Sequence, residues 1–311
     1  MIAIANAAYG LGLLLVGAVV AFLTDRAVAA AQHRPVPAMR VLVRNFLHEV
    51  VSPDPGNKWK DKVLFYGGAP LALAAVATAL TVIPISPIFT HQPMPQLTVG
   101  VFFYLVILDF MAVALYSAGW GANNSAGSQG AFVAVAQLIS YVVPLGFAAT
   151  GAIMAAQSLR ATEVINVQAR TLWFGVWQPY GLAIYLLAVL GQTYRPPTNL
   201  PVRGEGTNVA AEYVGTGAAG LKLALYAIWF AAAAMGTVLF LGGWHGPWLP
   251  GMVWFFIKTT ALLAAMSWFG TKVQPLSLER MVRFAWIVLI PASIASVVFV
   301  GLTIALAGWW R

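Results

Sequence analysis

Residues 1–26 read MIAIANAAYGLGLLLVGAVVAFLTDR, and the run from 3 to 24 contains no charged side chain. A helix needs about 20 consecutive apolar residues to cross the hydrocarbon core of a bilayer. A secretory signal peptide would have a basic start and a shorter apolar run. We therefore interpret residues 3–24 as the first membrane span.

The rest of the chain has the same character. It is 60% hydrophobic and 8% charged, with a mean hydropathy of +0.81, whereas soluble domains carry about 25% charged residues. We expect an all-α polytopic membrane protein, a single membrane domain over residues 1–311 with about eight transmembrane helices. The predicted spans are 3–24, 63–84, 98–118, 130–156, 170–191, 218–242, 248–270 and 284–308. The spans at 130–156 and 218–242 are rich in Ala and Gly, which favours close helix packing.

The loops between these spans differ in charge. The odd-numbered loops hold 12 of the 17 lysines and arginines, and the other side holds only Arg160, Arg170 and Arg311. The positive-inside rule places the odd-numbered loops in the cytoplasm and both termini on the opposite side. This predicts a multi-pass protein of the inner (plasma) membrane or an equivalent energy-transducing membrane. The flanking charges explain the net charge of +8, so no nucleic-acid partner is expected.

Two loops are candidates for binding. In loop one, residues 37–51 (PAMRVLVRNFLHEVV) have apolar residues at helical spacing, with Arg40, Arg44 and His48 on another face. This predicts an interfacial amphipathic helix, either a simple anchor or the wall of an entrance for an amphipathic ligand. Loop five is long and charged, which is more often functional than a spacer. Loop three (119–129, GWGANNSAGSQ) is interpreted either as a turn or as backbone lining a cavity.

Charged residues inside spans are costly and suggest function. Asp109 and Lys258 lie within predicted spans, while Lys222, near a span end, can extend its ammonium to the interface. The chain has no cysteine, which excludes cysteine-ligated iron–sulfur clusters and a thiol nucleophile. Nucleotide-binding, metalloprotease and serine-hydrolase motifs are missing. The four histidines are scattered over different loops, so no metal site and no catalytic residue are expected.

Several motifs point to one family. Residues 119–147, GWGANNSAGSQGAFVAVAQLISYVVPLGF, resemble the GWxSNSKYxxxGxxRxxAQxISYEVxLG stretch of the H subunit of NADH–quinone oxidoreductase, respiratory complex I. RPPTNLP at 195–201 is similar to its RxPFDLPE motif, AEYVG at 211–215 to its EYSG, and LFLGGW at 239–244 to its LFxGGW. The motifs follow the family's order from about residue 37 to the C-terminus, with the same number of spans.

The resemblance implies a subunit of a multi-subunit translocase that performs no redox chemistry itself. Its cytoplasmic loops would help form the quinone chamber and the junction with the hydrophilic arm. The expected partners are other membrane-arm subunits, the quinone-reducing hydrophilic-arm subunits, lipids and quinone as the substrate, with no covalently bound cofactor and no iron–sulfur cluster or flavin in this chain. The resemblance and the buried charges give these candidates for the chamber or for proton coupling: Arg40, Arg44, Glu49, Arg195, Glu205, Glu212, Lys258 and Asp109.

The chain departs from the family where acids are expected. The Glu of SYEV is Val142, the Asp of FDLP is Asn199, and the Glu after that motif is Val202. A valine cannot accept or pass a proton. The resemblance therefore implies a proton-coupling role that is reduced, or rebuilt around Asp109. Two alternatives stay open: a membrane anchor of a related hydrogenase or other dehydrogenase, and a freestanding transporter, although the sequence has no convincing inverted repeat.

Overall fold

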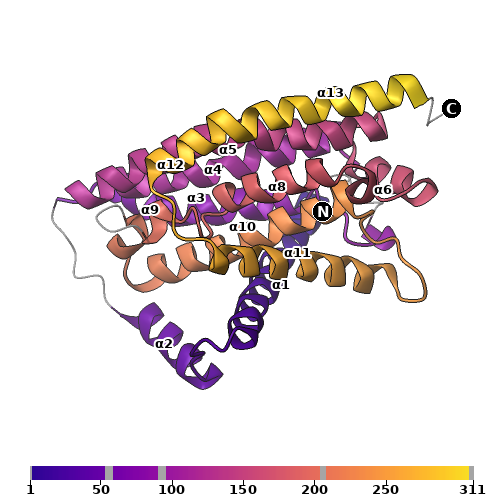
Figure 1. Cartoon of the computed structure of the whole chain (residues 1–311). Coiled ribbons are helices and arrows are strands. Elements are labelled where there is room, and N and C mark those ends of the chain that lie inside the picture. Colours follow the sequence, from indigo (N-terminus) through magenta and orange to yellow (C-terminus); the bar gives the residue numbers. More distant parts are fainter. Residues whose placement is uncertain (1, 53–58, 90–95, 204–207, 308–311) are drawn as a thin grey trace.

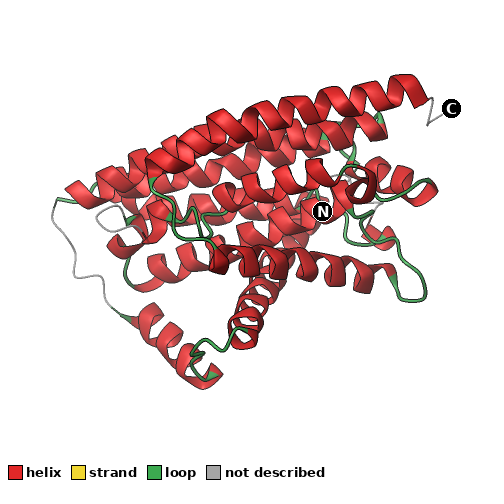
Figure 2. Ribbon diagram, in the orientation of Figure 1, coloured by secondary structure: helices red, strands yellow, loops and turns green. Residues whose placement is uncertain are grey.

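The computed structural model describes residues 2–52, 59–89, 96–203 and 208–307. These residues form helices joined by short connections and contain no β-strand (Figure 2). The long helices pack side by side, and the short helix α2 lies at one edge of the bundle, where it contacts α10 (Figure 1). The long helices are α1 (Ile2–Ala31), α3 (Lys62–Leu80), α4 (Gly100–Gly121), α5 (Ser125–Ala156), α10 (Gly215–Phe240), α11 (Gly251–Lys272) and α13 (Ile290–Ala307).

Shorter elements complete the described fold. A π-helical turn, η3 (Ala285–Leu289), joins α12 to α13, so residues 278–306 form one continuous apolar helix. The 3₁₀ turns are η1 (Pro87–Phe89) and η2 (Val209–Glu212). The remaining helices are α2 (Met39–Val51), α6 (Ala161–Arg170), α7 (Phe174–Trp177), α8 (Pro179–Gln192), α9 (Leu200–Arg203) and α12 (Leu278–Phe284).

The all-helical membrane fold is confirmed. In the described part of the chain, seven helices are long and apolar enough to cross a bilayer. The predicted span at 170–191 is interrupted: residues 171–173 leave the helical path, and Gln178 separates α7 from α8, the shorter apolar helix. Pro179 disfavours a helical conformation at the residue before it, which explains the second break. A total of eight spans therefore stays a prediction.

Helix α10 is the centre of the bundle. All of its residues from Ala227 to Phe240 are buried, and it packs against α1, α3 and α11. The many alanines let neighbouring backbones approach closely, as their composition predicted. This helix therefore supplies a fixed frame for the segments around it.

Loop three is shorter than predicted. Only Ala122–Asn124 lie outside helices, because residues 119–121 end α4 and residues 125–129 begin α5. Gly119 and Gly127 let the two backbones touch: a Cβ on Gly127 would lie 2.7 Å from the Gly119 carbonyl oxygen. The Asn124 side chain caps α5 by accepting a hydrogen bond from Gly127 N at 2.6 Å. The glycines and asparagine that resembled a loop therefore make a tight helix corner.

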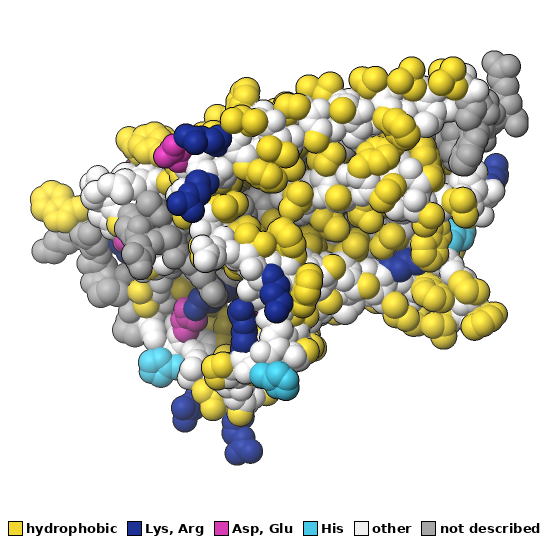
Figure 3. All heavy atoms as spheres, viewed as in Figure 1, with side chains coloured by type: hydrophobic (Ala, Val, Ile, Leu, Met, Phe, Trp, Pro, Cys, Tyr) yellow, Lys and Arg dark blue, Asp and Glu magenta, His cyan; other side chains and the backbone are white. Residues whose placement is uncertain are grey.

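The four odd-numbered loops meet at one end of the bundle. Hydrogen bonds join them directly: Asn123 Nδ2 to Trp59 O at 2.9 Å, Asn124 Nδ2 to Glu212 Oε2 at 2.6 Å, and Leu276 N to Pro197 O at 2.9 Å. Figure 1 shows α9 and α12 at this end and α6 near the other. In the space-filling view, most visible Lys and Arg side chains gather at the odd-loop end and over α2, whereas apolar side chains cover the helices (Figure 3).

Candidate functional site

A cavity of about 600 Å³ opens among the odd-numbered loops. Its walls come from the end of α1, from α2, from the loop-five segment with α9 and η2, and from α10 and the last turns of α11. Small-molecule sites commonly have this volume and mix apolar walls with a few polar groups. The lining residues with polar or aromatic side chains are Asp25, Arg34, Glu49, Thr193, Tyr194, Arg195, Asn199, Asn208, Tyr213, Lys222, Tyr226, Trp229, Ser267 and Thr271.

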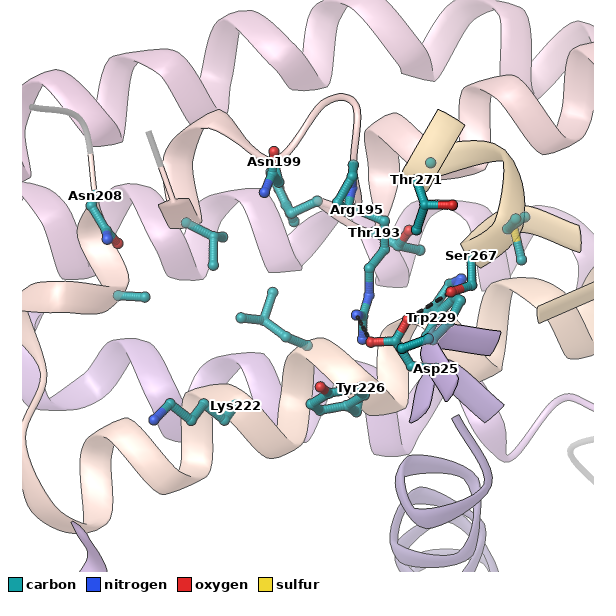
Figure 4. Close-up of a pocket in the computed structure, with 18 of the residues that line it drawn as sticks. Asp25, Thr193, Arg195, Asn199, Asn208, Lys222, Tyr226, Trp229, Ser267 and Thr271 are labelled. Atoms are coloured by element: carbon teal, nitrogen blue, oxygen red, sulfur yellow. Dashed lines mark hydrogen bonds and ion pairs between the residues drawn. The ribbon is translucent and has the colours of Figure 1, made fainter. Parts of the chain in front are cut away.

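Arg195 points across this cavity toward α10 (Figure 4). Its guanidinium carbon lies 4.1 Å from the ring centre of Trp229 and 4.4 Å from that of Tyr226. A planar, always charged guanidinium is suited to stacking on aromatic faces. Arg195 therefore forms a cationic surface backed by two aromatic rings, at the position that the sequence motif predicted.

Asp25 holds Arg195 in place. Its Oδ2 lies 3.5 Å from Arg195 Nη1, and its Oδ1 accepts a hydrogen bond from the Ser267 hydroxyl at 2.7 Å (Figure 4). Arg34 reinforces the same corner, because its Nη2 donates to the Thr271 carbonyl oxygen at 3.2 Å. These contacts tie α1, loop five and α11 together around the cavity.

Helix α2 contributes one residue to the cavity lining. Glu49 lines the cavity and forms an ion pair with Lys222 of α10. Arg40 and Arg44 are exposed on α2 and do not line the cavity. The structure thus brings Glu49 and Arg195 to one site and leaves the two arginines of α2 outside it. Lys222 has a partner in Glu49, an ion pair that the sequence did not predict.

Glu212 lies beside the cavity, where it links loops. Its carboxylate accepts the hydrogen bond from Asn124 in loop three, and its carbonyl oxygen accepts one from Lys60 Nζ at 3.4 Å. The next residue, Tyr213, stacks on Phe65 at 4.5 Å between ring centres and donates to its carbonyl oxygen. Burial raises the pKa of Tyr213 to about 12, which keeps this donor protonated. Glu212 and Tyr213 therefore fix loop five to α3.

Two of the positions where family acids are missing face the cavity. Asn199 and Val202 both line it, so the charged residues of its described lining are three cations, Arg34, Arg195 and Lys222, and two carboxylates, Asp25 and Glu49. The cavity is therefore more basic than it would be with the family's two acids at those positions.

Comparisons with known proteins place the chain. The sequence model of the NADH dehydrogenase family matches residues 5–301. The chain belongs to this family. The H subunit of NADH-quinone oxidoreductase from Geobacillus kaustophilus (strain HTA426) is 31% identical over 97% of this chain and 94% of its own length. An H subunit of the same enzyme from Rhodopseudomonas palustris, numbered 2, is 31% identical over 81% of the chain and 77% of its own length.

Of the remaining candidates in this NADH dehydrogenase family member, Lys258 and Asp109 lie away from the cavity. Lys258, only 5% exposed, lies near the opposite end of α11. Its ammonium donates hydrogen bonds of 2.5 to 3.2 Å to three carbonyl oxygens after α10 and lies 4.1 Å from the Trp173 ring centre; the acceptors are in Leu241, Gly243 and His245. Asp109 lies in the middle of α4. Glu205 lies outside the described residues.

The Lys258 ammonium holds the turn that follows α10, because Leu241 is the residue that ends the helix and Gly243 and His245 lie beyond it. The last carbonyl groups of a helix have no partner within it, and a cation there is favourable. Burial, and then the charge of Lys258, lower the pKa of His245 in the same loop, which keeps that imidazole neutral. The geometry therefore gives Lys258 a structural task at the end of α10.

Several cavity residues were missed by sequence reasoning. Asp25, Tyr226, Trp229 and Ser267 line the cavity, but they lie at span ends or within apolar spans, where charge and periodicity give no signal of a shared site. Asp25 and Arg195 are 170 residues apart. The one available signal was the pair Asp25–Arg26 that ends the first apolar run.

Proposed function

We propose that this chain is the H-type membrane-arm subunit of an NADH-quinone oxidoreductase and that the cavity is its share of the quinone-binding chamber. The observation that carries the proposal is the cavity itself: about 600 Å³, at the odd-loop end, around Arg195 and two aromatic rings. The names of the relatives support the assembly.

The residues present fit a quinone. A quinone is a flat ring with two carbonyl oxygens, so it needs aromatic walls and hydrogen-bond donors. Trp229 and Tyr194 contribute aromatic wall, although the indole N–H and the hydroxyl themselves are buried behind it. Arg195 and Asn199 also line the cavity and carry N–H donors. Arg195 supplies a charge that favours electron density on a carbonyl oxygen. This chain would bind and orient the ring, while its electrons would come from a partner subunit.

The surroundings support the rest of the proposal. The exposed apolar side chains of α2 (Met39, Val43, Phe46, Leu47 and Val51) suit contact with lipid, and Arg40 and Arg44 suit headgroups. We propose that α2 lies at the membrane interface beside the entrance. The linked odd-numbered loops would face the cytoplasm and form the junction with the quinone-reducing hydrophilic arm.

We propose that this chain takes a smaller part in proton coupling than the family motifs imply. Asn199 and Val202 line the cavity without a carboxylate, and Val142 leaves α5 without the acid of the SYEV motif. A proton route in this subunit would need another titratable residue. The relatives' names favour the NADH-quinone oxidoreductase over a hydrogenase anchor, and no observation favours a freestanding transporter.

A photoreactive quinone tests the proposal. The assembled complex would be illuminated with an azidoquinone, and labelled peptides of this chain identified by mass spectrometry. We expect label on the α10 segment around Tyr226 and Trp229, and its loss when excess unmodified quinone is present. Label confined to other subunits of an active complex would show that the cavity does not hold quinone.

A further inference from the structure

Asp109 is a carboxylate without a cation. It lies in the middle of α4, and its Oδ1 accepts a hydrogen bond from Gln192 Nε2 at 3.3 Å. Within the described part of the chain, no ion pair joins it to Lys or Arg. A carboxylate inside the membrane is costly unless it is paired, hydrated or protonated. Without a cation, Asp109 therefore depends on protonation, on water or on neutral polar groups around it.

Polar groups collect around it. The hydroxyls of Tyr104, Tyr141 and Tyr194 are buried and have no partner at full hydrogen-bond geometry in the described structure, although the Tyr141 hydroxyl lies beside both Asp109 and Tyr194. These three side chains are at most 3% exposed. Buried polar atoms are nearly always hydrogen-bonded, and those left without protein partners commonly bind internal water. Three such hydroxyls near one intramembrane carboxylate point to a hydrated polar cluster.

The cluster reaches the cavity. The Tyr141 side chain of α5 lies next to both the Asp109 carboxylate and the Tyr194 hydroxyl, and Tyr194 lines the cavity. A proton path from Asp109 to the cavity wall thus needs two intermediate side chains, Tyr141 and Tyr194, with water bridging their hydroxyls. Other nearby groups do not neutralise Asp109. Helix α3 has no charged residue from Val63 to Leu80, and Tyr185 of α8 faces Tyr104. Glu212 of η2 lies beside the end of α4, about three helical turns from Asp109.

We propose that Asp109 is a proton-exchange site that communicates with the cavity through Tyr141 and Tyr194. The inference rests on the proposed function in one respect, because it takes the cavity to be the quinone chamber. Asp109 takes the place of the acids that the chain lacks, at a position on a different helix from Val142.

The exchange is a proton relay with no net change in the tyrosines. Protonated Asp109 releases its proton to a bridging water. Each hydroxyl then accepts one proton at oxygen and gives up its own to the next acceptor, ending with water in the cavity. Asp109 is left as a carboxylate that is stabilised by the Gln192 amide. The reverse sequence protonates it again.

Infrared difference spectroscopy of the assembled complex in lipid nanodiscs, between two pH values, tests the relay. We expect a protonated-carboxyl band that shifts in D₂O and is lost in Asp109→Asn. In Tyr141→Phe and in Tyr194→Phe the band remains, but its hydrogen–deuterium exchange slows by roughly tenfold or more. Tyr180→Phe is the matched control, because this hydroxyl is also buried without a partner; its exchange should equal that of the wild type.

Two results would overturn the proposal: a spectrum of Asp109→Asn that retains every wild-type carboxyl band, or exchange in both tyrosine variants as fast as in Tyr180→Phe. If Asp109→Asn fails to assemble, Asp109→Glu replaces it, and the band must then move in frequency. Azidoquinone labelling of the same samples keeps the two proposals separate. If azidoquinone does not label this chain while exchange slows in the tyrosine variants as expected, only the quinone chamber is refuted. If labelling occurs while exchange is as fast in the tyrosine variants as in the wild type, only the relay is refuted.

Discussion

Arg195 is the residue on which the cavity depends most. It contacts the rings of Tyr226 and Trp229 and the carboxylate of Asp25, so it joins loop five to α10 and α1. Each cation–π contact contributes about 1 kcal/mol, and more when water is excluded. The Asp25 carboxylate is 37% exposed, so solvent screens the ion pair and stacking is the larger contribution.

The first prediction concerns Arg195→Ala and Arg195→Lys. We expect Arg195→Ala to lower kcat/KM for quinone roughly tenfold, because two ring contacts and a positive charge are lost. Arg195→Lys should recover only part of this, since an ammonium keeps the charge without the planar stacking surface. Quinone titrations of the purified complex measure both. Wild-type kcat/KM in both variants would show that Arg195 has no role in the chamber.

The second prediction separates Lys258 from the chamber. Lys258→Ala leaves three carbonyl groups in the turn after α10 without their donor, and hydrogen bonds to charged groups are worth about 1.5–3 kcal/mol each. We expect less assembled complex and earlier thermal inactivation, with an unchanged KM for quinone in the complex that does assemble. Normal assembly combined with an altered KM would instead give Lys258 the coupling role that the sequence first predicted.

At the scale of elements, close backbone contacts shape the site. Gly270 of α11 lines the cavity, and a Cβ there would collide with the Pro196 carbonyl oxygen of loop five. Loop five cannot move away freely, because Thr198 and Gln137 bond it to α5 and α8: Gln137 Nε2 donates to the Thr198 and Gly191 carbonyl oxygens, both at 2.7 Å. The absence of a side chain at Gly270 therefore sets how closely loop five approaches α11.

The third prediction follows from this contact. Gly270→Ala should destabilise the subunit by about 1–3 kcal/mol, because overpacking forces a backbone shift, and it should raise the KM for quinone. Gly67→Ala is the matched control: the site of its Cβ has no atom within 4 Å, and alanine favours a helix by about 1 kcal/mol. Thermal inactivation of the complex measures the difference. Equal stability of the two variants would contradict the packing argument.

Sequence reasoning predicted elements well where apolar length decides them. The spans at α1, α3, α4, α10 and α11 depend on long uncharged runs, which few other structures tolerate. It predicted the turn at loop three but made the loop too long, because Gly119 and Gly127 indicate a loop by composition and a helix corner only once their backbones are seen to touch. It predicted Arg195 through a motif and Glu49 through its place in loop one, but not Asp25, Tyr226 or Trp229, whose roles depend on three-dimensional proximity.

At the scale of the whole molecule, charge separates the two ends. The odd-numbered loops bond to one another and surround the cavity, whereas the loop between α10 and α11 presents Trp248, which is fully exposed, and no acidic or basic residue except His245. The positive-inside rule predicts that the cavity end faces the cytoplasm. This orientation is needed if a soluble arm is to deliver electrons to the chamber.

The fourth prediction tests the orientation, and the lack of native cysteines makes it direct. Single-cysteine variants Gln274→Cys and Trp248→Cys place thiols in exposed loops at opposite ends. A membrane-impermeant maleimide should label Trp248→Cys in right-side-out vesicles and Gln274→Cys only in inverted ones. The opposite pattern would place the cavity outside the cell.

The most direct test is a structure of the complete complex, prepared from membranes that contain its native quinone. We expect quinone density in the cavity, with its ring beside Tyr226 and Trp229 and a carbonyl oxygen near Arg195. A junction with the hydrophilic arm in which loop five closes the cavity, and in which quinone lies elsewhere, would contradict the proposed function.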